Sequence, residues 1–80
     1  MNIKVVAFGI AKDILNGREL QLEVKDASTV ADVKERLKTD FPDFKKLVKF
    51  SLAVGEEYRA DDFVISDNQE VIVIPPVAGG

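Results

Sequence analysis

Two segments near the start of the chain alternate apolar and polar residues with a period of two, which predicts β-strands. They span residues 3–8 and 18–24, and their apolar sets are Ile3, Val5 and Ala7 in the first and Leu20, Leu22 and Val24 in the second. Between them, a short helical piece at Ala11–Leu15 leads to Asn16-Gly17, a pair that tolerates positive φ. We therefore expect the two strands to form an antiparallel hairpin.

Helical periodicity replaces this alternation in the middle of the chain. Apolar residues recur there at steps of three and four, at Val30, Val33, Leu37 and Phe41. Thr29 precedes the run, and its hydroxyl can accept a hydrogen bond from the Asp32 amide while the Asp32 carboxylate favours the positive end of the helix. Because Pro42 disfavours a helical conformation at Phe41, we expect a helix of about three turns that ends there.

The second half of the chain returns to strand patterns. Residues 50–54 predict a third strand, and Gly55-Glu56 predicts a tight turn into a short strand at 57–59. The last strand is the β-branched run Glu70–Ile74, and Pro75-Pro76 ends it because proline cannot donate a ladder hydrogen bond.

This order of strands and helix predicts an α+β fold of the β-grasp (ubiquitin-like) kind. We expect a mixed sheet of four to five strands with one main helix packed on one face. The folded domain should span residues 1–74, and residues 75–80 should form a flexible C-terminal tail that contains Gly79-Gly80.

A single helix can cover only one face of such a sheet. Alternation in the last strand directs Val71 and Val73 to the helix, which leaves Ile72 and Ile74 on the open face, beside Phe8 if the first and last strands are neighbours. The resulting apolar patch indicates a surface for a partner protein. The alternatives are that a loop of the same chain covers these side chains or that they are scattered surface hydrophobes.

Composition limits the chemistry open to this chain. Among its 80 residues there is no His and no Cys, which excludes a Ser-His or Cys-His nucleophile, a zinc site with nitrogen or sulfur ligands, and a disulfide. No metal site is expected. The formal charge of −3, from 11 Lys plus Arg and 14 Asp plus Glu, argues against binding to nucleic acid or a membrane surface. With no apolar stretch near the ~20 residues of a membrane span and no secretory signal, we expect a cytoplasmic protein.

Two small charge clusters have more than one interpretation. The basic cluster could meet an acidic partner or a phosphate, or could be a solvated face, and the acidic cluster could steer association or keep a hairpin soluble. The basic cluster consists of Lys45, Lys46 and Lys49. The acidic cluster consists of Glu56, Glu57, Asp61 and Asp62.

The residues after the last strand form the most unusual segment. Its sequence is Pro75, Pro76, Val77, Ala78, Gly79 and Gly80. A frayed terminus would account for a diglycine. However, six extended residues can reach about 20 Å at ~3.3 Å each, and glycines without Cβ atoms can thread a narrow channel. Such a tail could deliver the α-carboxylate of Gly80 into the active site of another protein.

The chain resembles the MoaD/ThiS sulfur-carrier family along its whole length, and within it the carriers that serve as the small subunit of molybdopterin synthase. The resemblance is strongest at the last strand, the Pro-Pro step and the Gly-Gly end, residues 70–80. Residues 8–15 and 28–33 are similar to the family's first-strand exit and helix start.

The resemblance implies a carrier without a side-chain active site of its own. An ATP-dependent adenylyltransferase would activate Gly80, which would become a thiocarboxylate and donate its sulfur to a pterin precursor in molybdenum cofactor biosynthesis. The carrier itself would bind no cofactor, and ATP would be used by the activating enzyme. Its other partner would be the large synthase subunit, in a heterotetramer of two small and two large subunits. Phe8, Tyr58 and Ile74 match the family's docking positions, beside Ile72 from the alternation.

Two other functions remain open from the sequence. One is a carrier for thiamine or another sulfur-transfer pathway, and the other is a non-reactive ubiquitin-like interaction module. The Pro-Pro step favours the molybdopterin branch over the thiamine carriers, while the Gly-Gly end argues against an inert module.

Overall fold

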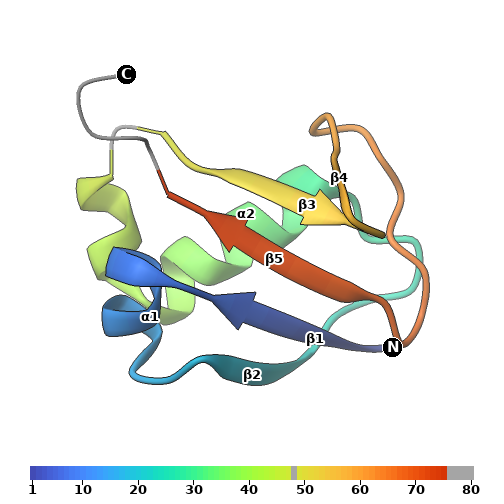
Figure 1. Cartoon of the computed structure of the whole chain (residues 1–80). Coiled ribbons are helices and arrows are strands. Elements are labelled where there is room, and N and C mark those ends of the chain that lie inside the picture. The colour runs from blue at the N-terminus through green and yellow to red at the C-terminus, as the bar shows by residue number, and fades with distance from the viewer. Residues whose placement is uncertain (48, 76–80) are drawn as a thin grey trace.

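The computed structural model describes residues 1–47 and 49–75. Five strands and three helical segments follow one another along the chain (Figure 1). In order they are β1 (Asn2–Ala7), α1 (Gly9–Leu15), β2 (Glu19–Glu23), α2 (Val30–Asp40), the 3₁₀ helix η1 (Pro42–Lys46), β3 (Ser51–Val54), β4 (Glu57–Tyr58) and β5 (Glu70–Ile74). The predicted strands are all present, and the bounds of β5 are those expected.

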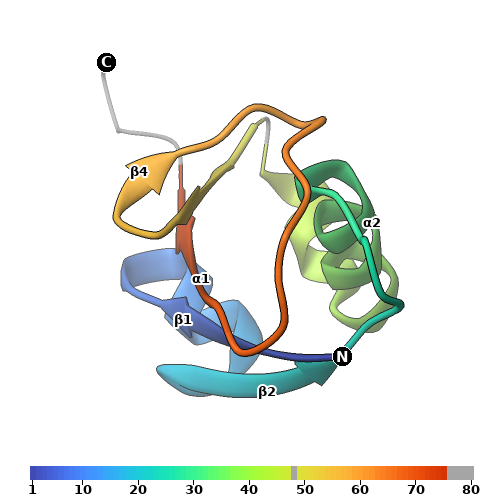
Figure 2. The ribbon, with the colours of Figure 1, turned by 90° about the vertical axis from the view of Figure 1, so that its right-hand side faces the viewer.

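The strands form one mixed sheet in the order β2-β1-β5-β3-β4. Strand β1 pairs antiparallel with β2, as the hairpin prediction required, and parallel with β5, while β3 is antiparallel to both β5 and β4. The first and last strands are therefore neighbours in the centre of the sheet. Together with α2 across one face, this topology is the predicted α+β β-grasp fold (Figures 1 and 2).

Helix α2 begins at the predicted cap. The Thr29 hydroxyl accepts a hydrogen bond from the Asp32 amide at 3.3 Å, and the Asp32 carboxylate accepts one from the Thr29 amide at 3.0 Å, so the two residues form a reciprocal capping box. The apolar stripe of Val30, Val33 and Leu37 is fully buried. It packs in the same core as Val71, Val73 and the inward residues of β1, which fixes α2 on one side of the sheet.

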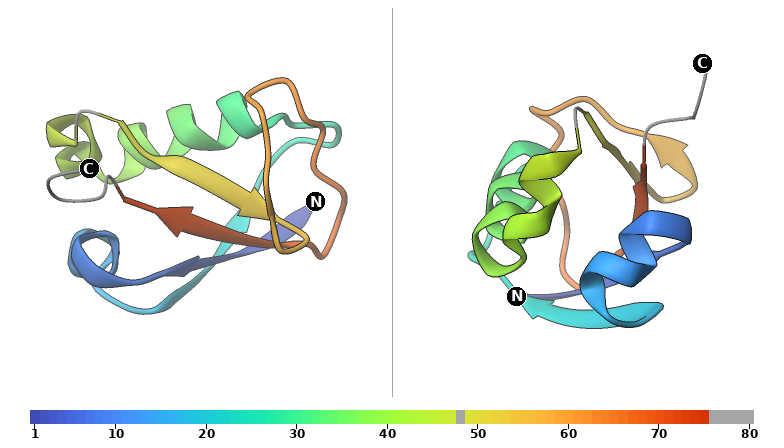
Figure 3. Two further views of the ribbon diagram at one scale, coloured as in Figure 1. Left: turned by 45° about the horizontal axis from the view of Figure 1, so that its top comes forward. Right: turned by 90° about the vertical axis from the view of Figure 1, so that its left-hand side faces the viewer.

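The connection between β1 and β2 holds a larger helix than the sequence suggested. Where a short helical piece at Ala11–Leu15 was expected, α1 spans Gly9–Leu15 and ends at Asn16, whose φ of 64° is left-handed. Ala11 and Leu15 are buried in the core. Helix α1 and η1 lie at the same end of the molecule, beside the end of β5 (Figure 3). The fold thus has a second α-helix, which closes one end of the core.

Candidate functional site: the open face of the sheet

The face of the sheet opposite α2 carries a row of side chains in register. Val6 on β1 pairs with Ile72 on β5, Ile72 pairs with Ala53 on β3, and Ala53 pairs with Tyr58 on β4. Residues paired in register point to the same face of a sheet. Four strands therefore contribute to one apolar row, although Ala53 and Tyr58 are far from Val6 in sequence.

Exposure along this face is highest at its two sides. Phe8 is 47% exposed on the β1 side and Tyr58 is 69% exposed on the β4 side, while Ile72 and Ile74 between them are half-buried. Phe8 has extended backbone angles, φ −133° and ψ 162°, so it continues the alternation of β1 by one residue. The guanidinium carbon of Arg18 lies 5.8 Å from the centroid of the Phe8 ring. Phe8 and Tyr58 are thus open to a partner, and no loop among the described residues buries them.

The start of the same face is polar. The ammonium group of Lys4 on β1 lies 3.0 Å from a Glu19 carboxylate oxygen on β2 and 3.8 Å from one of Glu70 on β5. The hydrogen bond and the charge of Glu19, followed by Glu70, raise the pKa of Lys4 above its ordinary value of 10.5. Lys4 and Val6 are two residues apart on β1 and lie on the same face of the sheet. This face therefore changes from charged to apolar toward the end of β5.

The apolar end of this face is where β5 leaves the sheet. Ile74 is the last residue of β5 and pairs with Ser51 of β3, and Pro75 follows directly. The structure therefore brings the predicted docking residues together: Phe8, Ile72 and Ile74 lie on the β1–β5 side, and Tyr58 is added by β4. The tail positions Pro76, Val77, Ala78, Gly79 and Gly80 lie outside the described residues.

Two hollows flank the apolar row. The first lies against Val6, Arg18 and Glu19, and the second against Gly55, Glu56, Gln69, Glu70 and Ile72. Both place carboxylates at the edge of apolar side chains. Glu56 lines the second hollow, where it could steer a partner toward the row. Glu57 pairs in register with buried Val54 and so points to the other face, and Asp61 lies beside Lys34 of α2, so these two members of the predicted acidic cluster are not on the open face.

Sequence reasoning missed two exposed apolar residues. Ile10 in the first turn of α1 is 51% exposed, and Val64 on the α2 side of the fold is 53% exposed. Ile10 lies two residues after Phe8, but no periodicity could assign its exposure before the length of α1 was known. Val64 follows Phe63 in a loop that bridges to Thr29, so it is not part of the open face.

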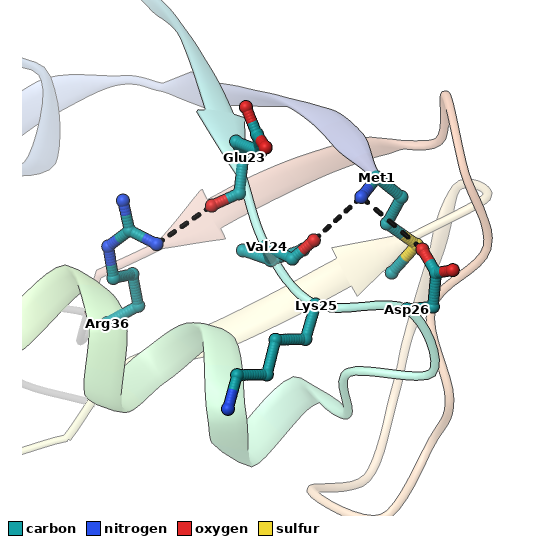
Figure 4. A pocket seen from close by; sticks show the side chains of 6 residues that line it. All are labelled: Met1, Glu23, Val24, Lys25, Asp26 and Arg36. Atoms are coloured by element: carbon teal, nitrogen blue, oxygen red, sulfur yellow. Dashed lines mark hydrogen bonds and ion pairs between the residues drawn. The ribbon is translucent and has the colours of Figure 1, made fainter.

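A further hollow lies near the N-terminus and has a structural explanation. Its lining residues are Met1, Glu23, Val24, Lys25, Asp26 and Arg36 (Figure 4). The Met1 ammonium group donates to the Val24 carbonyl at 2.7 Å and lies 3.4 Å from an Asp26 carboxylate oxygen. Arg36 of α2 donates to the Glu23 carbonyl at 2.8 Å. These contacts tie α2 and the chain start to the end of β2.

Metal-ligand clusters and membrane-spanning helices are both absent from residues 1–47 and 49–75. In this part of the chain no three His, Cys, Asp or Glu side chains are placed to hold a metal ion together. None of the described helices has the length and apolarity needed to cross a bilayer. The exposed apolar side chains of the open face suit docking, and the reactive group that the sequence suggested is the main-chain carboxylate of the tail.

Comparison with known proteins extends this interpretation. The model of the ThiS family matches residues 5–80. A relative from Arabidopsis thaliana, named molybdopterin synthase sulfur carrier subunit, is 30% identical over 81 residues, which cover 100% of this chain and 84% of the relative. This name describes the same function that the family resemblance, strongest at the tail, implied for the chain.

Solved structures agree with the fold. A putative molybdopterin converting factor, subunit 1, from Pyrococcus furiosus matches with a TM-score of 0.88 at 26% identity, covering 96% of this chain and 99% of the other. A complex of subunits 1 and 2 of the molybdopterin-converting factor from Helicobacter pylori contains a chain that matches with a TM-score of 0.68 at 17% identity, covering 100% of both chains. Because the family model spans nearly the whole sequence, the chain belongs to the ThiS family.

Proposed function

We propose that this protein is a sulfur carrier and the small subunit of a molybdopterin synthase, and that it carries sulfur as a thiocarboxylate on Gly80. The observation that carries the proposal is the apolar row of Val6, Ile72 and Tyr58, which lies on the face that leads to the base of the Gly-Gly tail. The relative named molybdopterin synthase sulfur carrier subunit, aligned over the full chain, supports the same function.

The proposed chemistry takes place at the carboxyl group of Gly80. A carboxylate is a poor electrophile because its charge is delocalised over two oxygens. Attack of this carboxylate on the α-phosphate of ATP forms an acyl-adenylate and releases pyrophosphate. A sulfur donor at the sulfide level then attacks the acyl carbon, and AMP leaves with the electron pair of the broken C–O bond. The product is a thiocarboxylate, whose sulfur is a usable nucleophile.

The carrier contributes the docking face and the tail, and its partners contribute the catalytic side chains. In this proposal an ATP-dependent adenylyltransferase loads Gly80, and the large synthase subunit receives the tail in its active site. Phe8, Tyr58, Ile72 and Ile74 dock on these partners, and burial of their apolar surface supplies the favourable free energy of association. The Helicobacter pylori complex of two converting-factor subunits supports a large-subunit partner. We extend the proposal to a heterotetramer of two small and two large subunits in the cytoplasm.

Channel insertion explains why glycine is needed at the end of the tail. Residues without Cβ atoms allow the backbone to pass through a channel too narrow for side chains. Six residues follow the last residue of β5, and a fully extended segment of that length can reach about 20 Å at ~3.3 Å per residue. The reacting group can therefore act inside a partner while the folded domain remains outside.

Intact-mass measurement tests the proposal. The protein is produced in a host with the complete sulfuration machinery, and a parallel sample comes from a host that lacks the adenylyltransferase. We expect a fraction of the first sample to show replacement of one oxygen by sulfur at Gly80, and none of the second. A protein that stays at its unmodified mass in both hosts would refute the carrier function.

A pull-down separates the molybdopterin function from the thiamine alternative. We expect the carrier to retain the large synthase subunit from a lysate. Retention of a thiazole synthase instead would assign the protein to thiamine synthesis, and sulfur loading with neither partner bound would point to another sulfur-transfer pathway.

A further inference from the structure

A fourth hollow, with a different chemistry, lies on the helix side of the molecule. It forms where α2 meets the chain that enters β3 and the loop after β4. Its lining residues are Lys34, Lys38, Leu47, Lys49, Phe50 and Asp61. Since α2 covers the sheet face opposite the apolar row, this hollow is separate from the docking face described above.

Three lysines converge on one carboxylate in this hollow. The Lys34 ammonium group donates a hydrogen bond to Asp61 at 2.7 Å and lies 5.9 Å from the Phe50 ring centroid. The Lys34 side chain is only 20% exposed. Lys34 first, and also Lys49 and Lys38, lower the pKa of Asp61 below its ordinary value of 3.8. Three lysines and one carboxylate line the hollow, and even with Glu35, which pairs with Lys38, positive charge remains in excess there in a chain whose net charge is −3.

Two of these lysines can form an ion pair with a ligand. Lys38 makes only a surface pair with Glu35 at 3.6 Å, which a stronger carboxylate contact can replace. Lys49 makes no ion pair with any residue in the described part of the chain. An incoming anion therefore finds two ammonium groups on opposite elements, one on α2 and one ahead of β3.

The floor of the hollow is apolar. Phe50 is buried, and its ring lies 5.2 Å from that of Phe44 in the core. Leu47 is half-buried against the same core. A ligand that combines a carboxylate with an adjacent apolar side chain would use both the lysines and this floor, whereas a free phosphate would use the lysines alone.

We propose that this hollow binds an acidic segment of a partner protein, with one carboxylate between Lys38 and Lys49 and a neighbouring apolar side chain against Leu47 and Phe50. Charge complementarity carries the assignment, because the hollow is a cationic site on an otherwise acidic protein. The same net charge opposes nucleic acid, which would bring many phosphates to this small site. The proposal does not depend on the chemistry of Gly80, because it uses the other face of the fold.

An NMR titration tests this site directly. The probe is a short synthetic peptide that carries two glutamates beside a leucine, added to isotopically labelled protein at low salt. We expect amide shifts confined to the residues that line the hollow and weakening as salt is added. The double variant Lys38→Glu with Lys49→Glu should weaken binding about fivefold or more, since two exposed ion pairs are lost and two repulsions are created.

The matched control makes the same change of charge elsewhere on the surface. The double variant Lys12→Glu with Lys25→Glu should bind the peptide as the unchanged protein does, because both lysines are exposed and lie away from the hollow. An equal loss of affinity in both double variants would overturn the proposal, as would shifts spread over the whole surface.

Two further titrations distinguish the ligand class. Inorganic phosphate that bound as tightly as the peptide would reduce the hollow to a simple anion site and overturn the proposed protein segment. A single-stranded oligonucleotide that bound more tightly than the peptide would overturn it in favour of nucleic acid. Because the first titration uses the unchanged protein, the result stands even if a double variant fails to fold.

Discussion

Val6 of β1 lies directly beside Ile72 of β5 in the parallel register at the centre of the sheet. The two residues are separated by most of the chain, and both point away from α2. Their neighbours one pleat further along, Phe8 and Ile74, stand where β1 and β5 leave the sheet. The apolar face is therefore a product of the parallel pairing of the first and last strands, and it ends beside Pro75, the first residue of the tail.

Replacing Ile74 with aspartate should weaken binding to the large synthase subunit. Ile74→Asp places a charge that must lose its hydration at an apolar contact, and we expect the dissociation constant to rise about tenfold or more. Titration calorimetry with the purified subunit measures the effect. Val64→Asp is the control, because Val64 is 53% exposed but lies off the open face, and its affinity should not change. An unchanged affinity of Ile74→Asp would contradict the proposal that the open face contacts the large subunit.

The capping box predicts the effect of shortening Thr29. Thr29→Ala removes the hydroxyl that accepts from the Asp32 amide, and we expect the free energy of unfolding to fall by about 1 kcal/mol. Thr39→Ala is a matched control, because the Thr39 hydroxyl only donates to the Glu35 carbonyl of its own helix. Urea denaturation followed by circular dichroism compares them. An equal fall in the free energy of unfolding in the two variants would mean that the capping hydrogen bond of Thr29 does not stabilise the fold.

Backbone strain at Ala27 predicts a stabilising substitution. Its φ of 64° is left-handed, which costs an L-residue roughly 1–2 kcal/mol, while glycine loses only about 0.5–1 kcal/mol of extra conformational entropy. Ala27→Gly should therefore raise the free energy of unfolding by about 0.5–1 kcal/mol. Ala31→Gly, inside α2, should lower it by a similar amount. A loss of stability in Ala27→Gly would contradict the assigned backbone conformation.

The ion pair between Asp61 and Lys34 predicts a dependence of stability on pH. Lys34 lowers the pKa of Asp61 in the folded state, so the pair stabilises the fold above the ordinary value of 3.8 and loses its contribution as pH falls through the lowered pKa. At neutral pH we expect Asp61→Asn to be less stable than the unchanged protein. The two should converge once the medium is acidic enough to protonate Asp61. Denaturation midpoints over this acidic range measure the difference, and a constant gap at all pH values would refute the interpretation.

Local signals in the sequence were sufficient for much of the fold. The bounds of β5 follow from a β-branched run between a turn and Pro75, and the start of α2 follows from Thr29 and Asp32. The open face also followed from alternation, since Ile72 and Ile74 had to point away from a single covering helix. Each of these inferences rests on residues within a few positions of one another.

Features that depend on tertiary contacts were harder to predict. Helix α1 begins two residues before the expected piece, at Gly9, where the Lys12 amide donates to the Phe8 carbonyl, and its packing through Ala11 and Leu15 depends on a core formed by distant strands. The Lys34 side chain on α2 is only 20% exposed because Asp61 and Phe50 approach it from other elements, and helical periodicity alone carries no signal for those contacts. The exposure of Ile10 likewise depends on where α1 packs.

Genetic complementation tests the central claim most directly. A strain that lacks its own small synthase subunit receives either the unchanged protein or a variant from which only Gly80 is deleted, and the activity of its molybdoenzymes is measured at matched protein levels. Because deletion misplaces the reacting carboxylate, we expect activity only with the unchanged protein. Equal activity with the deleted variant would contradict the assignment of the sulfur to Gly80.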